Sequence, residues 1–271
     1  MNNSSASPSS LKWLLVAVIT AFSTLAVAQP DVAEIVQKSE LAAYYAGQDG
    51  RADARMMIVD SQGRKQLRQF TLLRKDVADN GDQKMLVFFT RPTDVKDTVF
   101  RVEKHAALDQ DDDRWLYLPA LDLVKRISAG DKRTSFVGSH FFYEDVSGRA
   151  VSEDSFTLEQ ENDDSWILRA VPKVTSSVEF AYYLVTIDRT NYLPVKIEFY
   201  RDNGNQYRQV EAVQIEDVQG IPTVLRSKVS DLDSGGYTLM EFRNVQYDLG
   251  LPEDLFTERS LRTPPVQWLK P

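Results

Sequence analysis

The sequence predicts a mainly β protein whose strands form one antiparallel meander, with a helix at the start of the folded part. Short segments rich in β-branched and aromatic residues follow one another from Arg51 onward, about eleven in all, and clusters of Gly, Pro, Asn and Asp separate them. Segments joined so closely usually pair with their neighbours in sequence, so the sheet should be antiparallel. No linker, repeat or shift in composition divides the chain.

The first 28 residues have the pattern of a secretory signal peptide. Lys12 precedes an apolar stretch over residues 13–27, and Ala26 and Ala28 form a small-x-small exit. The stretch is too short to span a bilayer comfortably. We therefore expect cleavage after Ala28, export of the product, and a single mature domain over residues 29–271.

Charge and cysteine content exclude several partners and chemistries. Without Lys12 the mature part has 31 basic and 40 acidic residues, a net charge of −9. This balance argues against nucleic acid, which is bound by basic patches, and it disfavours adsorption to anionic lipid headgroups. The negative net charge does not exclude the binding of acyl chains.

There is no cysteine, so disulfides and thiol chemistry are absent, and we expect a monomer held together by burial alone.

Residues 31–45 should form an amphipathic helix. Val32, Ile35, Val36, Ala42 and Ala43 recur at helical spacing after a Pro-Asp start. Gly residues at 47 and 50 then end the helical pattern.

The expected strands follow this helix, and the sequence predicts a turn before one of them and burial of both its faces. Asn80-Gly81 between apolar runs indicates a hairpin, because both residues tolerate positive φ. Residues 85–89 are apolar on both faces, so this strand must be covered on both sides.

Segment 113–127 adds a short strand, a Pro turn and a second, basic strand. Residues 263–271 contain three prolines and should lie over the surface. The other expected strands are residues 55–59, 67–73, 85–90, 98–103, 156–161, 166–171, 182–187, 195–200, 208–215, 224–232 and 237–247.

No catalytic or metal-binding motif stands out. His105 and His140 are far from metal-ligand spacing, and Ser139 lacks the strand–turn–helix context of a hydrolase nucleophile. We expect His105 at a surface strand end. The acidic run 109–113 lacks the Gly of a calcium loop and should form a solvated turn, with Asp113 paired to Arg114 or Lys125. We expect no metal, no cofactor and no catalytic residue. A carboxylate pair for carbohydrate hydrolysis stays open as an alternative.

The clustering of the aromatic residues is the strongest local signal. Large rings either fill the concave side of a curved sheet or line a pocket for a long apolar ligand, and both roles fit the sequence. The rings within residues 88–143 are Phe88, Phe89, Phe100, Trp115, Tyr117, Phe136, Phe141, Phe142 and Tyr143.

The same region carries a resemblance to a known family. Residues 115–120 (Trp-Leu-Tyr-Leu-Pro-Ala), 125–128 (Lys-Arg-Ile-Ser) and 135–145, from Ser-Phe-Val-Gly-Ser to Tyr-Glu-Asp, resemble the signature of the outer-membrane lipoprotein-sorting-like proteins, relatives of the carrier LolA. Residues 89–100 and 188–200 are similar to flanking parts of that family. Two residues depart from the family pattern. Asp97 replaces the usual Gly, which suggests an unstrained turn, and His140 replaces an acidic residue, which suggests mild pH sensitivity.

The resemblance implies a single curved antiparallel sheet, an unclosed barrel capped by helices, whose apolar concavity takes up acyl chains. It implies a periplasmic carrier of a lipoprotein or lipid that works toward the outer membrane, in a branch often associated with resistance-nodulation-division (RND/MMPL-type) exporters. Residues 128–139, with Gly130 and Gly138, would serve as a lid. Lys125 and Arg126 would orient an anionic headgroup or dock to the exporter, or else form only a solvated strand edge. The candidate cavity residues are Phe88, Phe89, Trp115, Tyr117, Phe136, Phe141, Phe142 and Tyr143.

A second reading of the same fold is a periplasmic sensor of mislocalised lipoproteins that binds a membrane-bound partner. Such a regulator normally carries a further C-terminal domain, whereas this sequence ends soon after its last expected strand. The third reading is the carbohydrate hydrolase, which would need a deep polar cleft with two carboxylates.

Overall fold

The computed structural model describes residues 1–2, 31–107 and 110–269. The expected signal peptide, residues 1–28, lies outside the described residues except for its first two. All that follows concerns the compact unit that begins at Asp31. Within the described ranges, no helix has the length and apolar character needed to cross a membrane.

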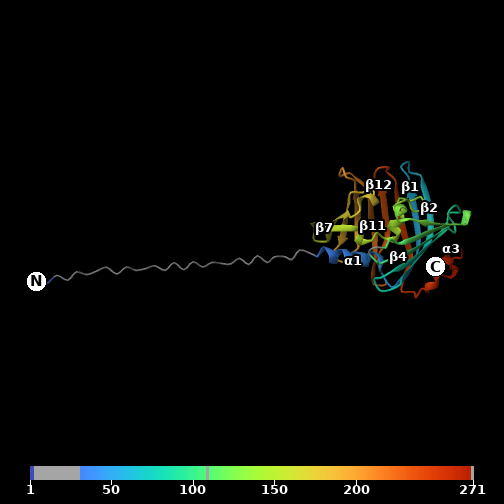
Figure 1. Ribbon diagram of the computed structural model, residues 1–271, viewed down its shortest axis with the longest axis horizontal. Coiled ribbons are helices and arrows are strands. Elements are labelled where there is room, and N and C mark those ends of the chain that lie inside the picture. The colour runs from blue at the N-terminus through green and yellow to red at the C-terminus, as the bar shows by residue number, and fades with distance from the viewer. Residues whose placement is uncertain (3–30, 108–109, 270–271) are drawn as a thin grey trace. The chain divides into compact units, whose positions relative to one another are not determined.

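The described part forms one antiparallel sheet of thirteen strands (Figure 1). The strands are β1 (Asp49–Val59), β2 (Lys65–Asp76), β3 (Gln83–Arg91), β4 (Val99–Lys104), β5 (Asp113–Leu118), β6 (Leu123–Ile127), β7 (Asp154–Glu161), β8 (Ser165–Pro172), β9 (Tyr182–Asp188), β10 (Pro194–Tyr200), β11 (Gln206–Val218), β12 (Ile221–Asp231) and β13 (Tyr237–Tyr247). Their spatial order is β6-β5-β4-β3-β2-β1-β13-β12-β11-β10-β9-β8-β7. Neighbours in the sheet are thus neighbours in sequence, apart from β1 and β13. The mainly β meander and the unclosed barrel are confirmed.

Short helices accompany the sheet. The α-helices are α1 (Val32–Tyr44), α2 (Tyr143–Ser147), α3 (Arg259–Arg262) and α4 (Val266–Leu269), and the 3₁₀ turns are η1 (Pro119–Leu121), η2 (Ala129–Asp131), η3 (Val151–Glu153), η4 (Thr175–Ser177) and η5 (Glu253–Phe256). Figure 1 shows α1 beside β7 and α3 at the other side, near β4.

The expected helix at residues 31–45 is confirmed. Asp31 caps α1 by accepting a hydrogen bond from the Ala33 amide at 2.9 Å, which satisfies one of the free N–H groups of the first turn. The buried side of α1 packs through Ile35 against the second half of the sheet, where Leu168, Ile187 and Phe199 form part of one core cluster.

The prediction that residues 85–89 are covered on both faces is also confirmed. Val87 and Phe89 point into the concave side of the sheet and belong to its core. Leu86 and Phe88 point to the convex side, where η5 and α3 supply Phe256 and other apolar side chains. Successive strand residues face opposite sides, so a strand that is apolar throughout requires these two layers.

The C-terminal segment lies over the convex face, as expected for the proline-containing tail. The short helix α4 follows the prolines, and Trp268 packs against the convex-side cluster. Arg51 donates through Nε to the Trp268 carbonyl at 2.9 Å, so the tail is hydrogen-bonded to the first strand.

Residues 128–153 connect β6 to β7, the two edges of the sheet. We call them the seam segment. Phe136, in its middle, has no exposed surface and packs against Phe89, Phe100 and Tyr143 with ring centroids 5.5–5.7 Å apart. This part of the seam segment is therefore core.

The turn before β4 corrects one expectation. Asp97 adopts a left-handed backbone conformation with φ 64°, so the turn does require the geometry that glycine adopts most easily, and the expectation of an unstrained turn was wrong. Aspartate is one of the few residues that adopt this conformation at moderate cost.

A candidate ligand cavity under the first helix

A cavity of about 350 Å³ lies on the concave side of the sheet. Its roof is the C-terminal half of α1 and the turn after it, through Ala42, Ala43 and Tyr44. Most of its wall is apolar, and the size falls within the range typical of small-molecule sites. The side chains from the sheet that form its apolar wall include Phe70, Leu72, Met85, Ile197, Val210, Val224, Met240, Phe242 and Val245.

Arg74 on β2 holds the roof in place. Its Nη1 donates to the Tyr44 carbonyl at 2.9 Å and to the Asp76 carboxylate at 2.7 Å, and its Nη2 donates to the carbonyls of Ala46 and Gly47. The end of a helix leaves several carbonyl groups without partners, and here the guanidinium binds the carbonyl of Tyr44, the last residue of α1, and two carbonyls of the turn that follows. The roof is thus fixed to the sheet by hydrogen bonds as well as by packing.

Tyr44 joins the roof to the seam segment. Burial raises the pKa of its phenol well above the usual value, so the ring stays neutral. A Cβ atom at Gly148 would lie 2.9 Å from the Tyr44 ring, and Gly148 has φ 84°. Only glycine combines this backbone conformation with such a close approach.

The inner end of the cavity is formed by Phe141, Asp145 and Val146 of the seam segment. Asp145 accepts a hydrogen bond from the Phe142 amide at 2.6 Å and is ion-paired with Arg208 of β11. Within the described part of the chain, Asp145 supplies the one carboxylate among the residues that line this cavity.

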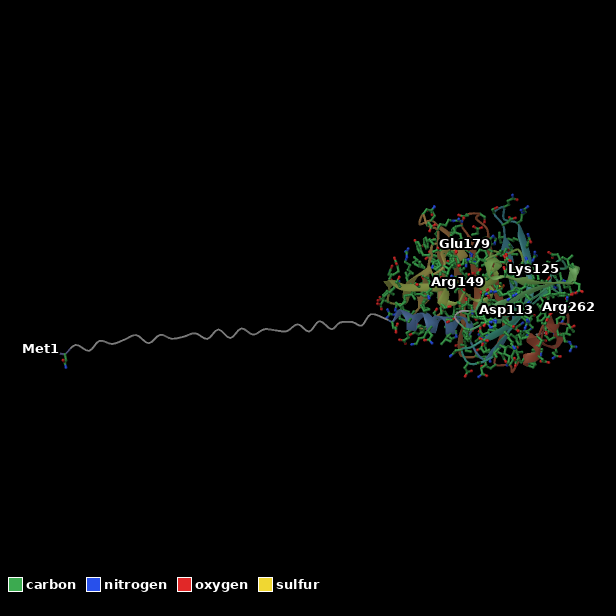
Figure 2. The ribbon with its side chains drawn as sticks, in the orientation of Figure 1. Met1, Asp113, Lys125, Arg149, Glu179 and Arg262 are labelled. Carbon is green, nitrogen blue, oxygen red and sulfur yellow. The ribbon has the colours of Figure 1, made fainter. Side chains whose placement is uncertain are left out.

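A buried ion cluster anchors the seam segment beside the cavity. Glu144 is 2 % exposed, and Arg133, Arg149 and Lys132 surround it. Burial would raise the pKa of Glu144, but the three cations outweigh burial and lower it. Arg133 also pairs with Glu179, at 2.7 Å. Figure 2 labels Arg149 and Glu179 in the same part of the fold.

The predicted cavity residues divide among three environments. Phe141 lines the cavity. Phe89, Phe136 and Tyr143 belong to the same concave-side core cluster as Phe141, and none of the three is among the residues that line the cavity. Phe142 packs against the guanidinium groups of Arg133 and Arg208.

Phe88, Trp115 and Tyr117 lie on the convex face, in the cluster that the C-terminal segment covers. The Arg101 guanidinium lies over the Trp115 ring, 4.4 Å from its centroid. The aromatic block is therefore split by the sheet. A role of the convex-face rings in binding a ligand stays a prediction, and it would need a site other than the cavity under α1.

Lys125 and Arg126 are exposed on β6, the edge strand at one end of the sheet. Arg126 pairs with Asp113. Neither basic residue is among the described residues that line the cavity, and their roles in headgroup or partner binding stay predictions.

The acidic run 109–113, of which residue 109 lies outside the described residues, differs over residues 110–113 from the solvated turn that we expected. Asp112 and Arg114 are buried and paired at 2.7 Å, because the Arg114 side chain turns inward and brings the carboxylate with it. Asp113 pairs with Arg126 and His105, and its expected pairing with Arg114 or Lys125 was wrong. His105 follows β4 as expected, but its side chain is only 15 % exposed.

His140 hydrogen-bonds through Nδ1 to the Thr238 hydroxyl at 2.8 Å. Burial lowers its pKa, Asp231 opposes this shift and Arg208 adds to it. No cluster of metal-ligating side chains occurs within the ranges that the structure describes.

The sequence analysis did not identify most of the residues that line the cavity. Leu72, Met85, Met240 and Phe242 lie on strands that were predicted, and they share one face with the core residues Phe70 and Val87. Their alternation could have assigned them to the concave side. It could not have shown a space there, because the space depends on how far α1 stands from the sheet.

An unclosed antiparallel barrel with a helix over an apolar concavity defines the LolA-like class of proteins, which confirms the family resemblance. A family model described only as "Uncharacterized protein" matches residues 81–263, more than half of the chain, so the chain belongs to that family. No curated protein matches.

The solved structures similar to this one include three that cover most of this chain. A DUF1329 family protein from Desulfovibrio piger ATCC 29098 has a TM-score of 0.75 and 28 % identity, over 84 % of this chain and 95 % of that one. A protein domain from Vibrio parahaemolyticus, named for outer membrane lipoprotein sorting, has a TM-score of 0.75 and 27 % identity, over 84 % and 97 %. The LolA superfamily protein NE2245 from Nitrosomonas europaea, 18 % identical over 85 % and 99 %, has a TM-score of 0.64 and shows the shared fold.

Proposed function

We propose that this protein is a carrier that takes the acyl chains of a lipoprotein or lipid into the cavity under α1. The observation that supports this most is the cavity itself, about 350 Å³ of mainly apolar wall under a helical roof. The similarity to a domain named for lipoprotein sorting points the same way.

The energetics suit such a role. Each methylene group that leaves water contributes about 0.8 kcal/mol, so ten buried methylenes contribute roughly 8 kcal/mol before the costs of association. The net free energy of binding is smaller by those costs, so it is less than the roughly 8 kcal/mol that corresponds to micromolar affinity. A ligand held at this strength can be taken up and released again.

The cavity favours a carrier over a carbohydrate hydrolase. Hydrolysis of a glycosidic bond generally needs two carboxylates facing each other across the substrate. Of the described residues that line this cavity, Asp145 alone supplies a carboxylate, and most of the remaining wall is hydrocarbon.

The remaining parts of the proposal concern location and partners. We place the carrier in the periplasm, moving its cargo toward the outer membrane, with an RND/MMPL-type exporter of the inner membrane as the donor. The signal-peptide pattern and the family resemblance support these steps. Co-purification of a tagged protein with such an exporter from solubilised inner membranes, lost when Lys125 and Arg126 are both changed to Glu, would support the donor and the docking edge.

A pair of substitutions on one helix tests the carrier proposal. Ala43→Trp places a large ring in the cavity from its roof, whereas Ala33→Trp places the same ring on an exposed position of α1. We expect Ala43→Trp to weaken binding of a fluorescent fatty-acyl probe at least about tenfold, and Ala33→Trp to leave it unchanged. Failure of the wild-type protein to bind the probe, or equal losses in both variants, would contradict the proposal.

A further inference from the structure

Asp145 brings a carboxylate to the wall of a mainly apolar cavity. Its side chain is 15 % exposed, and it lines the cavity between its neighbours Phe141 and Val146 of the seam segment. A carboxylate in such surroundings is costly unless other groups satisfy its oxygens.

The two oxygens of Asp145 have different surroundings. Oδ2 accepts hydrogen bonds from the Phe142 amide and from Nη2 of Arg208. No hydrogen bond between residues that the structure describes uses Oδ1. One acceptor of the ion pair is therefore occupied and the other is available.

Arg208 compensates the charge but is itself out of reach. It is 3 % exposed, and its guanidinium lies 4.3 Å from the ring centroid of Phe142 and 5.1 Å from that of Phe199. Its Nε and Nη1 atoms are enclosed and have no hydrogen-bond partner. A ligand in the cavity can thus meet the acceptor Oδ1 of Asp145, whereas the buried Arg208 is not among the described residues that line the cavity.

We propose that Asp145 determines specificity by accepting a hydrogen bond from a donor on the bound acyl ligand, such as an amide N–H, a hydroxyl or an amine. This inference rests on the proposed carrier function. A ligand that carries a donor beside its chain satisfies Oδ1, whereas an ester, which has only acceptors, leaves Oδ1 without a partner and places its own oxygens near a negative charge. The preferred cargo is therefore an amphiphile with a hydrogen-bond donor next to its acyl chain.

Two ligands with the same chain test this. Dodecanamide and methyl dodecanoate differ in whether the polar end can donate, and each is used to displace a fluorescent acyl probe from the purified wild-type protein. We expect dodecanamide to bind about tenfold more tightly, the usual effect of one hydrogen bond to a charged group. This comparison needs no variant, so it holds even if substitution of Asp145 impairs folding.

Two variants then locate the effect. Asp145→Leu should bind both ligands with equal affinity, and Ser227→Ala, which removes a polar group elsewhere in the same cavity, should keep the tenfold preference. Equal binding of the two ligands by the wild-type protein, or loss of the preference in Ser227→Ala alone, would overturn the role of Asp145 and leave the carrier proposal intact. If neither ligand nor the probe binds, the carrier proposal fails and this inference fails with it.

Discussion

Nη2 of Arg74 lies 2.7 Å from the carbonyl oxygen of Gly47, and through this contact the second strand of the sheet holds the end of the first helix. The same guanidinium reaches Tyr44, the last residue of α1, and Ala46 in the turn that follows. Gln83 on β3 also donates to the Tyr44 carbonyl, at 2.8 Å, so two residues of the wall fasten the roof of the cavity.

Arg74→Leu should loosen the roof. Loss of the guanidinium leaves the Tyr44 carbonyl with Gln83 as its donor and removes the donor of the Ala46 and Gly47 carbonyls. These two groups are half-buried, so each loss costs at most about 1–3 kcal/mol. We expect the amides of α1 to exchange with solvent at least about tenfold faster while those of β11 and β12 do not change. Hydrogen exchange followed by mass spectrometry measures this. Arg55→Leu is the control, because Arg55 is exposed on the neighbouring strand. Unchanged exchange in α1 would argue against the fastening role of Arg74.

The two faces of the sheet should differ in ligand binding. Phe141 lines the cavity, while Trp115 packs under the C-terminal segment on the convex side. We expect Phe141→Ala to change the affinity for a fluorescent acyl probe several-fold and Trp115→Ala to lower stability without changing affinity. Titration of both variants at equal folded concentration decides between them. A loss of affinity in Trp115→Ala would show that the ligand uses the convex face.

Glu144→Gln should be strongly destabilising. It removes the one buried carboxylate that Arg133, Arg149 and Lys132 share, and breaking a buried ion pair costs about 3–5 kcal/mol. We expect the lower end of this range, because Glu179, Asp154 and Glu153 still pair with these cations. Urea unfolding of the variant gives the value. Glu159→Gln, at an exposed position of β7, should change stability by less than about 0.5 kcal/mol. Similar midpoints for the two variants would mean that the cluster contributes little.

His140 should make the fold sensitive to mild acid. Burial lowers the pKa of its ring, and Arg208 lowers it further against the opposing effect of Asp231. The folded protein thus favours the neutral ring, so this contribution to stability is complete above the ordinary pKa of 6.5 and is lost as the pH falls through the lower pKa of the folded state. We expect the wild-type protein to lose more stability between pH 7.5 and 5.5 than His140→Gln does. Parallel pH dependences measured by thermal unfolding would contradict this.

The sequence predicted those parts of the fold that depend on short stretches of neighbouring residues. The helix at residues 31–45 follows from its cap and spacing, and the double cover of residues 85–89 follows from their composition. The burial of Asp112 could not be predicted, because it depends on Arg114 turning inward. Phe141 and Trp115 lie on opposite faces of the sheet. The face that each ring occupies depends on the turns between them, and the local amino-acid composition does not predict it.

The seam segment has a mechanical consequence. The edge strands β6 and β7 are consecutive in the chain, yet none of the twelve antiparallel pairings between described strands joins β6 to β7. The barrel can therefore widen by separating its two edges without breaking any strand-to-strand hydrogen bond. The cost of widening falls on the side-chain contacts of residues 128–153, above all those of Phe136 and Glu144. The contacts of this connecting segment therefore hold the two edges at their distance, together with α1, which packs on the second half of the sheet and is hydrogen-bonded to β2.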